Sequence, residues 1–258
     1  MHVPSPSPSL APAVLASLAN DRLRHFRRAV PAGGHRATLE LYLLDAELAS
    51  GLHALFRNVE VLLRETMHRA LAAHFGPRWF SDQSFRAALD QRTLTAVDDA
   101  IRGVRPSWDT PSAGSVVAHL MLGTWVQILA PGAQGRQEAV IWQPALASAF
   151  QRSRPLARAD AFELAQRVNW ARNRVNHCEP VVFGFPLPGQ VTAKGRRRRV
   201  TPQQVLDDSR ELVAAVDPAV AAWIGTWAEI DGLLADPRVG AALAYKAADR
   251  GIHLEGRR

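Results

Sequence analysis

Residues 171–180 read ARNRVNHCEP, and they close a stretch that the sequence predicts to be helical. Apolar residues within 161–176 recur with a partial helical spacing, which favours an α-helix over this range. Pro180 biases the residue before it away from the helical region, so we expect the helix to stop within a residue or two of His177. Two arginines, two asparagines and a histidine then lie on the last turns of this helix.

Helix geometry limits which of these polar side chains can act together. Asn173 and His177 are i, i+4 neighbours, as are Arg172 and Asn176, so each pair shares a strip of the helix surface. Arg172 and His177 lie about 140° apart around an ideal helix, because the helix has 3.6 residues per turn. These two side chains would converge only if the last turn is distorted or if a second copy of the helix meets the first across a twofold axis.

The composition is ordinary for a soluble globular protein, with 47% apolar and 21% charged residues in a chain of 258. This length can bury a substantial core. The net charge is +7, and nearly all of the positive charge is arginine, because Lys194 and Lys246 are the only lysines. Arginine suits bidentate contacts with phosphate, and the basic balance is consistent with a polyanionic partner without identifying one.

Cysteine content and hydropathy indicate a cytoplasmic protein. Cys178 is the only cysteine, so no intrachain disulfide can form and a reducing compartment is expected. No uninterrupted apolar run is long enough for a membrane span, and we identify no secretory signal. The histidines show no metal-ligand spacing and no glycine-rich phosphate loop occurs, so neither a metal nor another cofactor is predicted.

The rest of the chain is predicted to be almost entirely helical, as a single domain over residues 10–250. Another helix is predicted after residues 194–199. Thr201 should act as the N-cap of this helix, with Pro202 at the first helical position. Residues 181–188 are interrupted by prolines and are not predicted as a strand. Residues 194–199 are predicted to form a dense basic loop. Residues 1–9 and 251–258 are expected to be disordered. The other predicted helices span 10–30, 37–75, 82–104, 115–129, 141–150, 161–176, 218–234 and 236–250.

The longest predicted helix, 37–75, carries a polar stripe beside its apolar face. Arg57, Glu60, Arg64 and His68 occupy this stripe, and Glu60 precedes Arg64 by four residues, which is the favoured order for a helical ion pair. From spacing alone we interpret the stripe as a solvated face with salt bridges.

Three stretches together resemble a known family. They are residues 39–64 continuing to 75–80, residues 115–125 with 141–142 and 149–150, and residues 172–177 followed by 179–180. The chain resembles the bacterial abortive-infection (Abi-like) family of the HEPN superfamily over about residues 38–230. The third stretch matches the HEPN signature, in which an arginine and a polar residue precede a histidine, with four residues between the arginine and the histidine.

The resemblance implies an all-α, HEPN-type helical bundle with additional N- and C-terminal helices that pairs as a homodimer. It also implies metal-independent RNA cleavage by arginine and histidine from both protomers, with Arg172, Asn173 and His177 as catalytic residues. Glu60 and Arg64 are supporting residues, since an acidic residue on the long helix could orient Arg172. A toxin-like role in phage defence follows, with an antitoxin or regulatory partner possible.

This sequence departs from the family pattern at three positions. Asn176 and Cys178 stand where many relatives have a small residue and a second histidine, and Glu65 follows Arg64 where an asparagine is usual. These departures leave Arg172 and His177 in place. They also keep open a second interpretation, a non-catalytic HEPN protein that binds RNA or another protein as an adaptor or sensor. A general basic helical interaction protein is a third, weaker interpretation.

The chemistry of RNA cleavage assigns each residue a role. Attack by the 2′-hydroxyl needs a group that accepts its proton and a group that protonates the leaving 5′-oxygen. It also needs a positively charged group that stabilises the negative charge of the phosphorane. Histidine suits the proton transfers. Arg172 suits the phosphate contact, because its guanidinium does not release its proton, and Asn173 could orient the histidine or hold a phosphate oxygen.

Each assignment has a structural alternative. His177 could instead interact with the helix dipole, and Arg172 could form a surface ion pair. We assign structural roles to Arg174 and Asn176. The basic loop could contact the RNA backbone or could simply be a solvated loop; its cationic residues are Lys194, Arg196, Arg197, Arg198 and Arg199.

Overall fold

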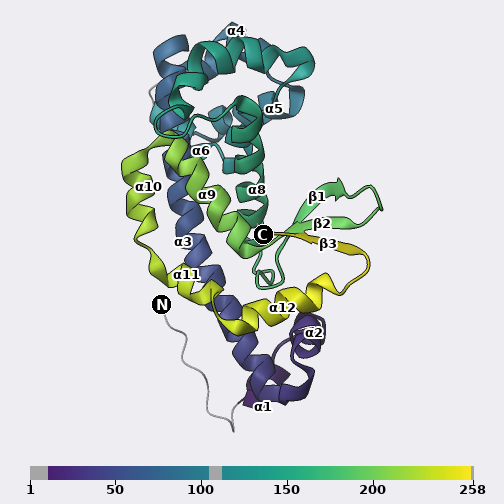
Figure 1. Ribbon diagram of the computed structural model, residues 1–258. Helices are drawn as coiled ribbons and strands as arrows, with labels where there is room; N and C mark the ends of the chain where they lie inside the picture. The colour runs from purple at the N-terminus through teal and green to yellow at the C-terminus, as the bar shows by residue number, and fades with distance from the viewer. Residues whose placement is uncertain (1–10, 105–111, 257–258) are drawn as a thin grey trace. The chain divides into compact units, whose positions relative to one another are not determined.

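The computed structural model describes residues 11–104 and 112–256 and is mostly helical, with one small three-stranded sheet (Figure 1). The predicted all-α class is therefore confirmed. The expected disorder of residues 1–9 lies outside the described residues. Within the described residues, no helix is both long enough and apolar enough to cross a membrane.

The chain divides into two compact units with four boundaries between them. Three boundaries fall inside the helices α3 (Gly34–Phe75), α8 (Arg158–Asn176) and α9 (Pro202–Val216), and the fourth follows Gly225, the last residue of α10 (Pro218–Gly225). Unit 1 contains the described residues up to Leu55, then Trp170–Asp207 and the described residues from Thr226. Unit 2 contains the described residues of Phe56–Asn169 together with Asp208–Gly225. The prediction of a single domain over residues 10–250 stays a prediction.

Unit 1 combines helices from both ends of the chain with the sheet. It contains the first part of α3, the last turns of α8 and the start of α9. Its elements are α1 (Ala11–Ala16), α2 (Asn20–Ala29), the 3₁₀ turn Pro31–Gly33, α3 (Gly34–Phe75), α8 (Arg158–Asn176), β1 (Phe185–Val191), β2 (Arg197–Val200), α9 (Pro202–Val216), α11 (Ala228–Leu234), α12 (Pro237–Ala247) and β3 (Ile252–Glu255).

Unit 2 holds the middle of the chain, together with the remaining parts of α3, α8 and α9. Its own elements are the 3₁₀ turn Trp79–Ser81, α4 (Gln83–Ala88), α5 (Gln91–Gly103), α6 (Ala113–His119), α7 (Leu122–Ile128), the 3₁₀ turn Ala133–Gly135, a π-helix (Glu138–Leu146), the 3₁₀ turn Ala147–Phe150 and α10 (Pro218–Gly225).

Several predicted helices are each two shorter ones, because short interruptions that keep the apolar spacing are hard to see in sequence. The predicted helix 82–104 stops at Leu89, whose backbone is extended, and α5 restarts where the Asp90 side chain accepts a hydrogen bond from the Thr93 amide at 2.7 Å. The predicted helix 115–129 is interrupted at Leu120 and Met121, which are also extended. Likewise, 10–30 becomes α1 and α2, and 218–234 becomes α10 and α11.

The sheet corrects three predictions, namely that residues 181–188 hold no strand, that 194–199 form a loop and that 251–258 are disordered. Strand β2 lies between β1, to which it is antiparallel, and β3, to which it is parallel (Figure 1). Pro186 pairs with Arg199 in the ladder, and β1 tolerates its prolines because it is an edge strand. The partner strand β3 lies more than fifty residues after β2, so no local pattern could predict the pairing.

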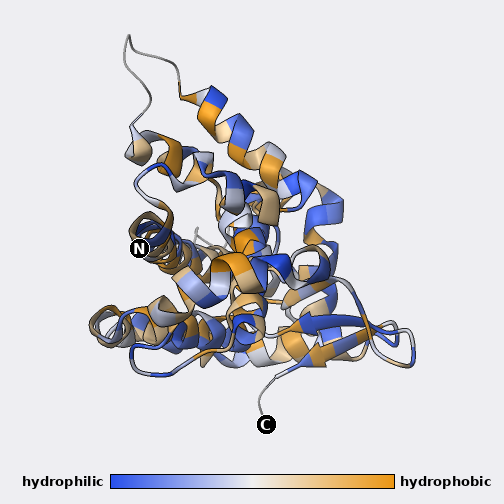
Figure 2. Ribbon diagram, turned by 90° about the horizontal axis from the view of Figure 1, so that it is seen from above, coloured by the Kyte–Doolittle hydropathy of each residue, from blue (hydrophilic) through white to orange (hydrophobic). Residues whose placement is uncertain are grey.

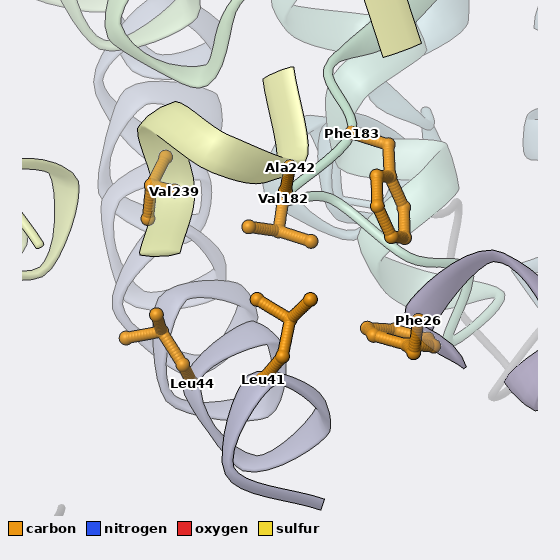
Figure 3. Packing of buried hydrophobic residues seen from close by; sticks show 7 residues of the cluster. All are labelled: Phe26, Leu41, Leu44, Val182, Phe183, Val239 and Ala242. Atoms are coloured by element: carbon orange, nitrogen blue, oxygen red, sulfur yellow. The ribbon is translucent and has the colours of Figure 1, made fainter. Parts of the chain in front are cut away.

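A hydrophobic cluster in unit 1 fixes the segment that follows α8. Bands of hydrophobic and hydrophilic residues alternate along the helical ribbons (Figure 2), as expected for helices with one buried face. Phe183, just after α8, packs its ring against Phe26 of α2, with ring centroids 5.1 Å apart. The cluster consists of Phe26, Leu41, Leu44, Val182, Phe183, Val239 and Ala242 (Figure 3).

The core of unit 2 is built on the second half of α3. Met67 and Leu71 are fully buried there, as the helical spacing predicted. Trp79 stacks at a tilt on Trp125, with ring centroids 5.6 Å apart. Its indole nitrogen also donates to Nδ1 of His68 at 2.9 Å, so His68 of the polar stripe has an internal partner.

Candidate active site at the end of helix α8

Helix α8 ends in a Schellman motif at the positions where the sequence predicted its stop. The amide of Cys178 donates to the carbonyl of Val175 at 2.9 Å, and the amide of Glu179 donates to the carbonyl of Arg174 at 3.0 Å. Cys178 has φ +53°, the left-handed conformation that glycine usually provides at this position. His177 is therefore the C-cap residue, which places its side chain at the very end of the helix.

Arginines hold the turn that follows the helix. Arg22 of α2 donates to the carbonyl of Cys178 at 2.7 Å. Arg174 donates to the carbonyl of Pro180 at 2.7 Å and pairs with the carboxylate of Glu179. Arg174 thus has the structural role that we assigned to it.

A buried carboxylate anchors the next two residues. Asp45 of α3 accepts hydrogen bonds from the amides of Val181 and Val182, both at 2.7 Å, and all three residues are buried. Burial raises the pKa of Asp45 to about 6, although the two amides and the positive charges of Arg174 and Arg22 act in the opposite direction. No local sequence pattern identifies Asp45, because its partners lie far along the chain.

The three predicted catalytic residues lie on the last turns of α8 and at its C-cap, all in unit 1. Arg172 and Asn173 are partly buried, and the guanidinium of Arg172 donates to the side-chain oxygen of Asn173 at 3.3 Å. His177 is exposed, and its backbone amide donates to the carbonyl of Asn173 at 3.0 Å. Among the described residues, the imidazole of His177 makes no hydrogen bond.

The two supporting residues belong to unit 2. Arg64 is half-buried and forms an ion pair with Glu65, with Nε and Oε1 3.3 Å apart. Glu65 is the residue that departs from the family pattern, so it has a definite partner here. Glu60 is partly buried. The pairing of Glu60 with Arg172 stays a prediction.

Most of the basic run makes internal contacts in the sheet. The guanidinium of Arg196 donates to the carbonyl of Ile252, Arg198 pairs with Glu255 of β3, and Arg199 donates to the carbonyls of Phe183 and Gly184. Lys194 and Arg197 are exposed. Of the five predicted RNA contacts, these two are therefore best placed to meet a phosphate backbone.

Cations from distant parts of unit 1 lie close enough to affect one another's ionisation. Burial lowers the pKa of Arg199 to about 10, with further lowering by Arg174 and Arg197. Burial also lowers the pKa of Lys246, and the neighbouring Arg199 lowers it further. This concentration of positive charge includes Arg174 from the end of α8, which favours an anionic partner there.

Metal-ligating residues do not gather in the described part of the chain. No group of three or more His, Cys, Asp or Glu side chains in residues 11–104 and 112–256 is placed to hold a metal ion. Cys178 is exposed as a free thiol.

Comparison of the chain with protein-family models, curated proteins and solved structures finds no match. The Abi-like resemblance therefore rests on the sequence motifs alone, and the geometry at the end of α8 is the structural indication of function.

Proposed function

We propose that this protein is a metal-independent endoribonuclease of the HEPN type, and that it acts as a toxin-like effector in phage defence. The observation that carries the proposal is the exposed imidazole of His177 at the C-cap of α8, which directly follows the turn bearing Arg172 and Asn173. An imidazole in contact with solvent can meet a phosphodiester, whereas a buried one could not.

In the proposed reaction His177 takes the proton of the ribose 2′-hydroxyl or gives a proton to the leaving 5′-oxygen. Arg172 holds the phosphate and stabilises the charge of the phosphorane, with Asn173 fixing its orientation through the 3.3 Å contact. The positive charge around Arg174 and Arg199 attracts the RNA backbone. The need for a 2′-hydroxyl restricts the reaction to RNA.

A homodimer completes the site. Arg172 lies on a regular helix and His177 is the C-cap five residues later, so the two side chains leave α8 in different directions. A twofold axis near the end of α8 would bring Arg172 of one copy beside His177 of the other. An antitoxin or regulatory partner would act by covering this helix end.

RNA cleavage by the full-length protein in EDTA tests the proposal, with His177→Ala and Arg172→Ala as the site variants. Asn176→Ala is the matched control, because Asn176 is exposed in the same turn and has no assigned role in catalysis. Both site variants should lose cleavage by about a hundredfold or more, as expected for a lost proton-transfer or charge-stabilising group. The control should cleave as wild type does, and the products should carry cyclic phosphate ends.

The dimer has its own test. If Arg172 and His177 act in trans, mixing the two inactive variants restores cleavage, because each mixed dimer contains one intact pair. Cleavage that persists in His177→Ala, or that requires a divalent metal, would refute the mechanism. Arg172-dependent RNA binding without any cleavage would favour the adaptor interpretation. One observation also favours the adaptor interpretation: among the described residues, the imidazole of His177 has no hydrogen-bond partner.

A further inference from the structure

Unit 2 contains an open cavity of about 720 Å³ that the proposed cleavage site does not use. This volume is within the range of small-molecule sites. Thr66 and Arg69 of α3 form one side of the cavity, Ser148 and Arg152 form another, and Asp217, between α9 and α10, contributes the remaining polar wall.

Two arginines give the cavity a positive charge. Arg69 and Arg152 are both exposed, and among the described residues neither guanidinium lies within ion-pair distance of a carboxylate. Other arginines of the same unit do have carboxylate partners, including Arg154 with Glu211 at 3.8 Å. Both cations line the same cavity without an ion-pair partner among the described residues, which indicates an anionic ligand.

Asp217 offsets only part of this charge, because a single carboxylate lines the cavity with the two guanidiniums, and this carboxylate also caps α10. One oxygen of the carboxylate accepts hydrogen bonds from the amides of Ala219 at 2.9 Å and Val220 at 3.2 Å. The other oxygen can accept a hydrogen bond from a ligand hydroxyl.

The wall that carries Arg152 is fixed in place before any ligand binds. The backbone amide of Arg152 donates to the carbonyl of Ala215 at 3.1 Å. The hydroxyl of Ser153 donates to the carbonyl of Ala214 at 2.6 Å. A wall held in this way loses little conformational freedom on binding, which favours affinity.

The lining residues narrow the chemical class of the ligand. Two guanidiniums that line one cavity favour a phosphate group, because each guanidinium can contact phosphate through two hydrogen bonds. The remaining polar groups are two hydroxyls and one carboxylate, which suit a partner rich in hydroxyl groups. No aromatic side chain lines the cavity among the described residues, so it lacks a surface on which a base would stack.

We propose that this cavity binds a phosphate monoester carried on a sugar. Two sources share this chemistry, a free sugar phosphate and the 5′-phosphorylated end of an RNA chain. The proposal goes beyond the ribonuclease activity and does not depend on it, because none of the lining residues belongs to the Arg172, Asn173 and His177 set.

Isothermal titration calorimetry on the full-length protein tests this site, with ribose 5-phosphate as the probe. Arg69→Ala and Arg152→Ala should each weaken binding about tenfold or more, since a charge-assisted hydrogen bond is lost. Arg154→Ala is the matched control, because Arg154 is exposed on the same segment and lies outside the cavity lining. It should bind as wild type does, and ribose without phosphate should bind far more weakly.

A short RNA with either a 5′-phosphate or a 5′-hydroxyl distinguishes the two sources. Preference for the phosphorylated RNA, lost in Arg152→Ala, assigns the site to RNA ends, and binding of ribose 5-phosphate alone assigns it to a free sugar phosphate. The proposal is overturned if neither binds, if inorganic phosphate binds as tightly as ribose 5-phosphate, or if Arg154→Ala weakens binding as much as the cavity variants do. Circular dichroism of each variant verifies that it is folded.

Discussion

Asp45 should make the stability of this protein depend on pH in a way that reports directly on the turn after α8. Burial raises the pKa of its carboxyl from 3.8 to about 6. The folded protein therefore binds more protons than the unfolded chain between these two values. The stability contributed by Asp45 is fully present below about pH 4 and is lost as pH rises through about 6.

The size of this effect follows from the pKa difference. About two pKa units correspond to about 3 kcal/mol of unfolding free energy. Asp45→Asn resembles the protonated carboxyl at every pH, so the variant lacks this contribution to the pH dependence. The difference in unfolding free energy between Asp45→Asn and wild type should therefore shift by about 2.5 kcal/mol in favour of the variant between pH 4 and pH 7, because part of the effect is already lost at pH 4. This shift does not depend on how the new amide packs.

Asp45→Ala tests the hydrogen bonds separately from the charge. It removes the acceptor from the amides of Val181 and Val182, which are fully buried. An unsatisfied buried amide costs about 1–3 kcal/mol, so the loss should be about 2–6 kcal/mol at pH 4, where the wild-type carboxyl is protonated in the folded state.

Urea unfolding at pH 4, 5.5 and 7 measures both effects. Asp21→Asn is the control, because Asp21 is an exposed carboxylate of the same unit. If Asp45→Asn keeps the wild-type pH dependence, the raised pKa is wrong. If Asp45→Ala is no less stable than the Asp21 variant, the two amides do not depend on Asp45.

Three further substitutions test other local features by urea unfolding. Cys178→Gly should stabilise the protein by about 0.5–1 kcal/mol, because Cys178 has φ +53°; an unchanged or lower stability would contradict this expectation. Gly184→Ala should cost about 2–4 kcal/mol, because φ is +77° and the new Cβ would lie 2.7 Å from a backbone oxygen of β2; a neutral effect would disprove the clash. Asp208→Ala should cost about 3–5 kcal/mol, because Asp208 is buried and its Oδ2 lies 2.7 Å from Nε of Arg167. Glu163→Ala removes only an exposed partner of the same arginine and should cost at most about 1 kcal/mol. Equal losses in the Asp208 and Glu163 variants would show that burial of the pair does not matter.

The candidate site could be predicted only in part. The C-terminal end of α8 and the place of His177 at it follow from the local effect of Pro180. The exposure of His177 and the contact between Arg172 and Asn173 come from the structure. The roles of Arg196, Arg198 and Arg199 could not be predicted, because each depends on which carbonyl or carboxylate of a distant segment lies within reach.

By itself, the sequence determined the features that depend on neighbours three or four residues away. The apolar spacing predicted the long helix α3, and Thr201 caps α9 through a hydrogen bond from the Gln204 amide at 3.1 Å. The tertiary structure alone decided the sheet and the anchoring of the turn after α8. Asp45 meets its amide partners across more than 130 residues, and β2 pairs with β3 across more than fifty. Such contacts form only when the chain has packed, so no periodicity or motif in the sequence can reveal them.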